Sequence, residues 1–208
     1  MASFVGIGAA PAHIQREDTS MTATAEFIDE AASTRRVRAH DRETIRYAIA
    51  PCSLGHVLVA LSEAGIVAIF LEADREVMRQ ALARQFSAAE LVEGGRELGA
   101  VAAQVVAFVE SPATELDLPL DMRGTEFQRS VWGVLRKIPA GCTATYAEVA
   151  ERVGKPRAVR AVAQACASNA LAVVVPCHRV VRSDGALSGY RWGVDRKRAL
   201  LDRESAST

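Results

Sequence analysis

The sequence lacks the features that would place it in a membrane, in a secreted class or around a metal ion. No apolar run among its 208 residues approaches the roughly 20 residues of a membrane-spanning helix, and residues 4–10 lack the basic flank of a signal peptide. Its four cysteines, Cys52, Cys142, Cys166 and Cys177, form no CxxC pair and no zinc-finger spacing. We therefore expect a soluble, cytoplasmic protein with reduced thiols, no membrane association and no metal site.

A net charge is also absent, but the charges are unevenly distributed. Lys and Arg together number 25, as do Asp and Glu, which argues against a protein that coats nucleic acid over its whole surface. Residues 152–203, however, contain eleven Lys or Arg against three Asp. This basic segment fits a solvated surface and a polyanion-binding surface equally well.

The first part of the chain predicts a leader and a small scaffold. Residues 1–40 have no sustained periodicity beyond a short helical stretch over 26–32, so we expect a weakly ordered leader. Residues 41–120 predict an α/β domain in which an antiparallel meander precedes two helices, and a last short strand returns to the sheet edge. The expected strands are 44–50, 56–61, 66–71 and 115–120, and the expected helices are 74–86 and 97–110.

Residues 121–208 predict a mainly helical domain. Capping-box patterns at Thr125–Gln128 and Thr145–Glu148 mark two helix starts. The second helix ends at Gly154, and Pro156 opens another. Two short helices around a glycine turn favour a helix-turn-helix, with an ordinary αα-hairpin as the alternative. In the last helix of this pair we expect a buried stripe of Val159, Val162, Ala163 and Cys166, and an outer face with Arg157, Arg160, Gln164 and Ser168 beside the small residues Ala158, Ala161 and Ala165.

The strongest chemical signal is the segment from Pro176 to Val180, which follows an apolar run over 170–175 that we expect to be a buried strand. A free thiol is only a few per cent thiolate at neutral pH, roughly, so a nucleophilic cysteine needs a base or positive surroundings. His178 and nearby arginines supply both to Cys177. Because adjacent side chains diverge, the imidazole would reach the thiol through a water. The acid that orients the imidazole would come from the final helix, where spacing leaves three candidates: Asp195, Asp202 and Glu204.

These residues resemble a known family. ProCysHisArgVal, preceded by Asn169 and by Tyr146 and Arg160 on the helix pair, and followed by Ser188-Gly189-Tyr190, is similar to the O6-alkylguanine-DNA alkyltransferases over residues 45–204. The likeness is closest to the carboxy-terminal half of longer bacterial members. It implies a small amino-terminal ribonuclease H-like α/β domain, followed by a helical domain with a helix-turn-helix and the active-site cysteine.

The resemblance also implies roles for individual residues. Cys177 would accept the alkyl group, His178 would act as base through water, and Asn169 would brace the turn. The family's relay acid lies 27 residues after the nucleophile, which is Glu204 here. Of the residues that would contact DNA, Arg160 would replace the extruded guanine in the duplex and Tyr146 would crowd the target phosphate. At the base, the Val180 carbonyl would accept a hydrogen bond from the exocyclic amine, and Tyr190 would close the pocket. The remaining contact residues would be Arg191, Ala161 and Arg157.

The implied activity is stoichiometric DNA repair. An alkyl group, mainly methyl, would pass from O6 of guanine to Cys177, with O4 of thymine as an open second substrate, and the resulting thioether would inactivate the protein. No cofactor is required. The expected partner is duplex DNA containing O6-alkylguanine, bound by a monomer or by monomers that assemble cooperatively along it, in a cytoplasmic protein that joins the nucleoid when bound to DNA.

Some expectations concern departures from the family and competing classes. Because no cysteine precedes Cys52, we expect neither phosphotriester repair nor a metal-linked transcriptional switch. Arg191 and Trp192 replace smaller residues of many relatives, which predicts a narrow pocket that favours methyl adducts. The competing classes are an alkyltransferase-like sensor without an acceptor cysteine, a thiol hydrolase with a Cys-His-Glu relay, and a plain helix-turn-helix regulator.

Overall fold

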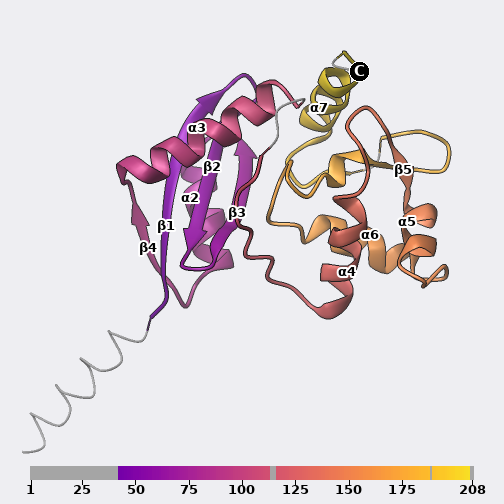
Figure 1. Cartoon of the computed structure of the whole chain (residues 1–208), viewed down its shortest axis with the longest axis horizontal. Coiled ribbons are helices and arrows are strands. Elements are labelled where there is room, and N and C mark those ends of the chain that lie inside the picture. Colours follow the sequence, from indigo (N-terminus) through magenta and orange to yellow (C-terminus); the bar gives the residue numbers. More distant parts are fainter. Residues whose placement is uncertain (1–41, 113–115, 188, 207–208) are drawn as a thin grey trace, which may run out of the picture. The chain divides into compact units, whose positions relative to one another are not determined.

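An antiparallel meander forms the first part of the fold. The computed structural model describes residues 42–112, 116–187 and 189–206, so the expected leader and its short helix lie outside the described residues. Strands β1 (Thr44–Cys52), β2 (Gly55–Ser62) and β3 (Gly65–Glu72) pair antiparallel in sequence order, which confirms the predicted meander (Figure 1). The turn residues Gly55 and Gly65 both have positive φ, a conformation that favours glycine.

Both faces of this sheet are covered. Every residue from Val57 to Ala60 in β2 is buried, although alternate side chains of a strand point to opposite faces. Helix α3 (Arg96–Glu110) contacts β1 and β2, and α2 (Arg75–Gln85), capped by the Asp74 side chain, contacts β3. Figure 1 shows α3 in front of the sheet and α2 behind it. The two predicted helices are confirmed, and they close the hydrophobic core around the meander.

The two edges of the sheet differ from the prediction. Strand β4 (Glu90–Glu93) pairs parallel with β1 and completes the order β3-β2-β1-β4, although no strand was predicted there. At the opposite edge the chain does return to β3, but the strand expected over 115–120 is wrong in its described part. Only Leu120 bridges to Ile66, whose amide donates to the Pro119 carbonyl at 2.8 Å.

The helical part contains α4 (Glu126–Leu135), β5 (Ala144–Thr145), α5 (Tyr146–Arg152) and α6 (Val159–Ala167). Both capping boxes are confirmed, at Thr125 with Gln128 and at Thr145 with Glu148. The start predicted at Pro156 is wrong, because residues 156 and 157 form a turn and α6 begins three residues later, at Val159.

The buried face of α6 is also rotated from the predicted stripe. Val162 and Cys166 are buried as expected, but Ala165 is buried too, whereas Val159 and Ala163 are exposed. The cause is the packing of α4, whose Trp132 indole N–H donates to the Ala165 carbonyl at 2.9 Å. Ala165 therefore does not belong to the small outer face predicted for this helix.

The apolar run over 170–175 is not a strand, so that prediction is wrong. Only Leu171 bridges to Ile69 of β3, after which the chain turns through Val173, whose φ is +63°. A single 3₁₀ turn, η1 (Cys177–Arg179), follows and leads into β6 (Val180–Val181), which pairs parallel with β5. Most of the run is buried because it packs as a compact turn against the sheet.

Two arginines attach helix α7 (Val194–Ala206) to the sheet and to helix α3. Arg203 donates to the Val109 carbonyl at 2.9 Å and to Ser53 Oγ at 2.6 Å. Arg196 donates to the Leu54 carbonyl and pairs with Glu72 at 3.2 Å. The helix therefore has a fixed position relative to β1–β3.

Residues 43–208 form one compact unit. The predicted boundary between two domains near residue 120 stays a prediction. Within the described ranges, no helix has both the length and the apolar character needed to cross a membrane.

Candidate active site

Cys177 lines a small cavity. The residue is 4 % exposed, and the cavity has a volume of about 310 Å³, which is at the lower end for ligand pockets. Three other residues expected at the site, Tyr146, Tyr190 and Arg191, line the same cavity. The remaining lining residues are Ala163, Cys166, Ala167 and Gly189.

Asn169 holds the turn that presents the thiol. Its Nδ2 donates to the Val175 carbonyl at 2.8 Å and to Cys177 Sγ at 3.2 Å, while its Oδ1 accepts from the Leu171 amide at 2.9 Å. Asn169 is itself only 1 % exposed. One buried amide therefore ties both ends of the 170–176 turn and contacts the sulfur directly.

His178 and Arg179 converge on one buried carboxylate. His178 Nε2 lies 2.8 Å from Glu204 Oε1, while Arg179 donates from Nε at 3.0 Å to Oε2 and from Nη2 at 2.8 Å to Oε1. Arg179 also donates to the Ile138 carbonyl. Of the three acids that sequence spacing left open, the structure brings Glu204 to His178, whereas Asp195 and Asp202 are exposed on α7.

The charge of Glu204 determines which nitrogen of His178 is basic. Burial alone would raise the pKa of Glu204, but the hydrogen bonds from His178 and Arg179 outweigh it and lower the pKa to about 2. An ionised carboxylate only accepts hydrogen bonds, so Nε2 carries the proton and Nδ1 has the free lone pair. Burial lowers the pKa of His178, against the opposing effect of Glu204, so the ring is neutral at pH 7. Nδ1 is buried and has no hydrogen-bond partner among the described residues.

The thiol is not ionised by its surroundings alone. Burial raises the pKa of Cys177, while the Asn169 hydrogen bond and the positive charge of Lys197 act in the opposite direction. Cys166, on the wall of the same cavity, has its pKa raised to about 12, mainly by burial. Of the two thiols that line the cavity, Cys177 has partners that stabilise its thiolate, whereas Cys166 stays protonated.

Lys197 is a component that the sequence reasoning missed. It is fully buried, its Nζ donates to the Val180 carbonyl at 2.6 Å, and its charge favours the Cys177 thiolate. The pairing of Arg179 with Glu204 was likewise not predicted. A signal existed in the last helix, because Lys197, Leu200 and Glu204 fall on one helical face, and two charged residues in a core stripe indicate a buried polar site.

The two carbonyls expected to face a base are already used once. The Val180 carbonyl accepts from Lys197, and the Cys177 carbonyl accepts from the Val180 amide within the 3₁₀ turn. A carbonyl oxygen has two lone pairs, so each can accept one further hydrogen bond. Tyr190 stands edge-on to His178 at 6.4 Å between ring centroids, and burial raises the pKa of its hydroxyl well above the ordinary value.

The expected DNA-contacting residues of α6 lie apart from this cavity. Arg160 and Ala161 are exposed in the first turn of α6, and Arg157 is exposed in the turn before it. None of the three lines the Cys177 cavity. The structure leaves these three residues on the surface. It brings together the other expected site residues: Cys177, His178, Asn169, Glu204, Tyr146, Tyr190, Arg191 and Val180.

The expected narrowing by Trp192 is wrong. Trp192 does not line the Cys177 cavity, because its ring packs on Phe70 with 4.9 Å between centroids. Arg191 does line the cavity, and its guanidinium lies over both aromatic rings, 5.3 Å from Phe70 and 4.8 Å from Trp192. Any narrowing by this pair therefore comes from Arg191 alone.

In the described part of the chain, no group of three or more His, Cys, Asp or Glu side chains could hold a metal ion.

Known proteins share both the sequence and the fold of this site. The family model described as 6-O-methylguanine DNA methyltransferase, DNA binding domain, matches residues 126–206. A methylated-DNA–protein-cysteine methyltransferase of Methanosarcina barkeri is 38% identical over 159 residues, which cover 76% of this chain and 96% of that protein. The chain belongs to the methylated-DNA–protein-cysteine methyltransferase family.

Other members of this methyltransferase family extend the comparison. The bifunctional transcriptional activator/DNA repair enzyme Ada of Escherichia coli is 52% identical over 161 residues, which cover 77% of this chain and 46% of Ada, so the chain spans about half of that relative. A crystal structure of Mycobacterium tuberculosis OGT in complex with DNA matches with a TM-score of 0.66 and 32% identity, covering 78% of this chain and 94% of that one. The mixed α/β architecture, an amino-terminal sheet followed by a helical region, is therefore that of the family.

Proposed function

We propose that this protein repairs O6-alkylguanine in duplex DNA by transferring the alkyl group to Cys177. The observation that carries the proposal is that Cys177 lines a cavity of about 310 Å³ and is followed directly by His178, which is paired with the buried Glu204. Membership of the methyltransferase family supports the same reaction class.

The proposed chemistry is a single displacement. His178 Nδ1, the nitrogen with the free lone pair, takes the thiol proton through a water, and Glu204 stabilises the resulting imidazolium. The Cys177 thiolate attacks the alkyl carbon, the carbon–O6 bond breaks, and the electron pair passes to guanine, which regains a proton. The product is a thioether. Since no group at the site can reverse that bond, each protein molecule acts once.

The burial of Cys177 favours a reaction with a base that is extruded from the duplex over one that stays in the stack. Cys177 is almost fully buried, so a guanine paired in a duplex cannot reach it, and the nucleotide must rotate out. Arg160, exposed on α6, would fill the gap in the duplex and so offset an unstacking cost of about a few kcal/mol. Tyr146 and Tyr190 on the cavity wall would hold the base, and the Cys177 and Val180 carbonyls would accept from its amine through their second lone pairs.

The DNA-binding surface in this proposal is the α5–α6 pair. Exposed Arg157, Arg160 and Ala161 lie on α6 or just before it, and a helix-turn-helix would place them in a groove. Small side chains permit close approach of the helix to the groove floor. A ribonuclease H-like classification of the sheet, acceptance of O4-alkylthymine, a monomeric state and a cytoplasmic location belong to the same proposal.

Mass spectrometry of the intact protein and its peptides tests the proposal. The protein is incubated with excess duplex DNA containing O6-methylguanine, beside a Cys177→Ala variant and, as a matched thiol control, a Cys142→Ala variant at the exposed cysteine. We expect one methyl group on the Cys177 peptide of the wild type and of Cys142→Ala, no methyl on Cys177→Ala, and no second turnover.

The alternatives give different results in the same experiment. A protein that binds the lesion without being methylated would belong to the sensor class. A protein that releases methylated product and reacts again would be a hydrolase. Preference for an undamaged operator sequence would indicate a plain regulator.

A further inference from the structure

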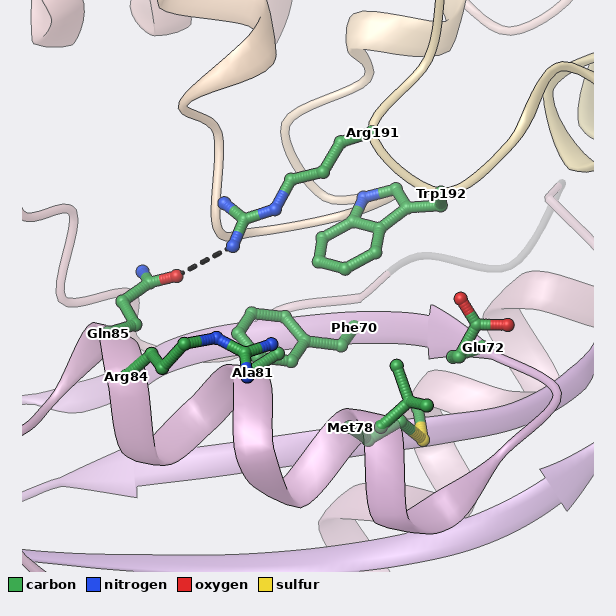
Figure 2. A pocket seen from close by; sticks show the side chains of 9 residues that line it. Phe70, Glu72, Met78, Ala81, Arg84, Gln85, Arg191 and Trp192 are labelled. Atoms are coloured by element: carbon green, nitrogen blue, oxygen red, sulfur yellow. Dashed lines mark hydrogen bonds between the residues drawn. The ribbon is translucent and has the colours of Figure 1, made fainter.

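A second cavity shares Arg191 with the Cys177 cavity. Its volume is about 480 Å³, and its walls come from β3, α2 and the segment that follows Tyr190 (Figure 2). Phe70, Met78, Ala81 and Trp192 contribute apolar side chains to its lining. Volume and lining fall within the range of small-molecule pockets, which combine apolar walls with a few polar groups. The other residues that line it are Glu72, Val77, Arg84, Gln85 and Arg191.

The charges around this pocket are unequal. Figure 2 shows Arg84 and Arg191 at the Gln85 end and Glu72 at the opposite end. Glu72 is neutralised by an ion pair with Arg196 at 3.2 Å. Arg84 makes no ion pair and no hydrogen bond with the residues that the structure describes, and Arg191 has only neutral acceptors there. Two guanidinium groups at one end are therefore left without a counter-charge.

Arg191 is held in a position from which it can still donate. Its guanidinium lies over Phe70 and Trp192, and it donates to Gln85 Oε1 at 2.8 Å and to the Asn169 carbonyl at 3.3 Å. A guanidinium has five N–H donors, so three remain for a ligand. Because the aromatic rings and Gln85 already fix the plane of the guanidinium, the Arg191 side chain would lose little conformational entropy when an anion binds.

We propose that the Phe70–Trp192 pocket binds a small organic anion, a phosphate ester or carboxylate on an apolar body. The apolar body would lie against Met78, Ala81 and Trp192, and the anionic group would pair with Arg84 and Arg191. Guanidinium groups suit both anions, because their paired N–H donors match two oxygens at once.

This pocket is linked to the proposed reaction through Arg191. The residue lines both cavities, and its Nη1 donates to the carbonyl of Asn169, whose amide contacts Cys177 Sγ. The positive charge of Arg191 also favours the Cys177 thiolate. An anion that pairs with Arg191 removes part of that effect, so occupation of the pocket should slow alkyl transfer. This linkage rests on the proposed function, whereas binding in the pocket does not.

The two tryptophans of the chain provide the measurement of binding. The Trp192 indole N–H is buried without a hydrogen-bond partner among the described residues and belongs to a pocket wall, whereas the Trp132 indole N–H is bonded to Ala165 inside the helical region. In ¹⁵N NMR spectra of the full chain, phenyl phosphate and benzoate should shift the Trp192 indole signal and leave Trp132 unmoved. We expect a dissociation constant of about 1 mM for such small probes.

Variants of the pocket give the matched controls. Arg84→Ala should weaken binding about fivefold or more, whereas Arg46→Ala, which removes an exposed charge outside the pocket, should not. Ala81→Leu fills the pocket and should abolish the shift, with the Trp132 signal reporting that the variant is folded. Benzamide, which lacks the charge, should bind weakly. The tighter of the two anions identifies phosphate esters or carboxylates as the ligand class.

Several results would overturn the proposal. An unmoved Trp192 signal, equal binding of benzamide, or unchanged affinity in Arg84→Ala each excludes an anion site. The linkage is tested separately, by the rate of methyl transfer at saturating probe, which should fall about twofold or more in the wild type. An unchanged rate excludes the linkage, and equal slowing in Arg84→Ala would place the probe in the Cys177 cavity instead.

Discussion

Replacement of Glu204 by glutamine tests the buried polar cluster most directly. Glu204 accepts hydrogen bonds from His178 and from two nitrogens of Arg179, and all three residues are nearly inaccessible to water. Glu204→Gln keeps the shape but leaves a buried guanidinium without its counter-charge. Removal of one partner from a buried ion pair costs about 3–5 kcal/mol, and we expect the lower end because the amide oxygen still accepts one bond.

The same change should also slow methyl transfer. A neutral amide no longer stabilises the imidazolium that forms when His178 takes a proton, and positioned bases contribute about 10²–10⁴ in rate. We therefore expect a loss of about 10²-fold in the second-order rate constant. Urea unfolding gives the stability, and timed mass spectrometry of the methylated protein gives the rate.

Two further variants separate charge from structure. Asp202→Asn removes an exposed carboxylate from the same helix and should change the free energy of unfolding by no more than about 0.5 kcal/mol. Glu204→Gln combined with Arg179→Met removes both charges, and should recover stability without recovering the rate. The reasoning would be refuted if Glu204→Gln cost less than about 1 kcal/mol, or no more than Asp202→Asn.

Three further predictions follow from the cluster, the thiol and the exposed helix. Because the pKa of Glu204 is about 2 against 4.5 when unfolded, its stabilising contribution is complete above pH 4.5 and is lost as the pH falls toward 2; acid titration of stability should show a loss of about 2–3 kcal/mol that Glu204→Gln lacks. Lys197→Met should raise the pKa of Cys177 further, so its iodoacetamide reaction should move to higher pH while that of exposed Cys142 does not; equal profiles would contradict the role given to Lys197. Arg160→Ala should leave iodoacetamide labelling of Cys177 unchanged but slow repair of duplex DNA by about tenfold or more, and equal repair by the variant would remove Arg160 from the base-flipping step.

The scaffold strands could be predicted because local signals agreed with the fold. The runs at β1, β2 and β3 are β-branched and are separated by glycine turns, so propensity and punctuation gave one answer. Strand β4 is only four residues long and begins and ends with glutamate. Such a short polar edge strand is defined by its pairing with β1, which no local pattern reveals.

The turn before Cys177 shows why an apolar run can mislead. Most of residues 170–175 are buried, as their composition indicates, but burial does not distinguish a strand from a packed turn. The Asn169 side chain determines that the segment forms a turn, because it hydrogen-bonds to both of its ends. A side chain that replaces strand pairing in this way is a tertiary effect, outside the reach of periodicity.

The site itself was predictable only in part. Cys177 and His178 could be predicted from the chemistry of a thiol beside an imidazole. Spacing alone did not distinguish Glu204 from Asp195 and Asp202 as the acid, and only the family resemblance selected Glu204. Lys197 was missed because a lysine is ordinarily assigned to the surface. Trp192 was expected at the Cys177 cavity, but it lines the second cavity, and its sequence neighbour Arg191 lines both.

The fastening of α7 has a consequence for protein engineering. The helix that supplies Glu204 is held by Arg203 on Val109 and Ser53, and by Arg196 on Leu54. A designer who kept only the helical part, as a portable alkyl-acceptor tag, would remove every one of those acceptors. The tag would retain Cys177 but lose the contacts that position Glu204. A working tag therefore has to include the sheet.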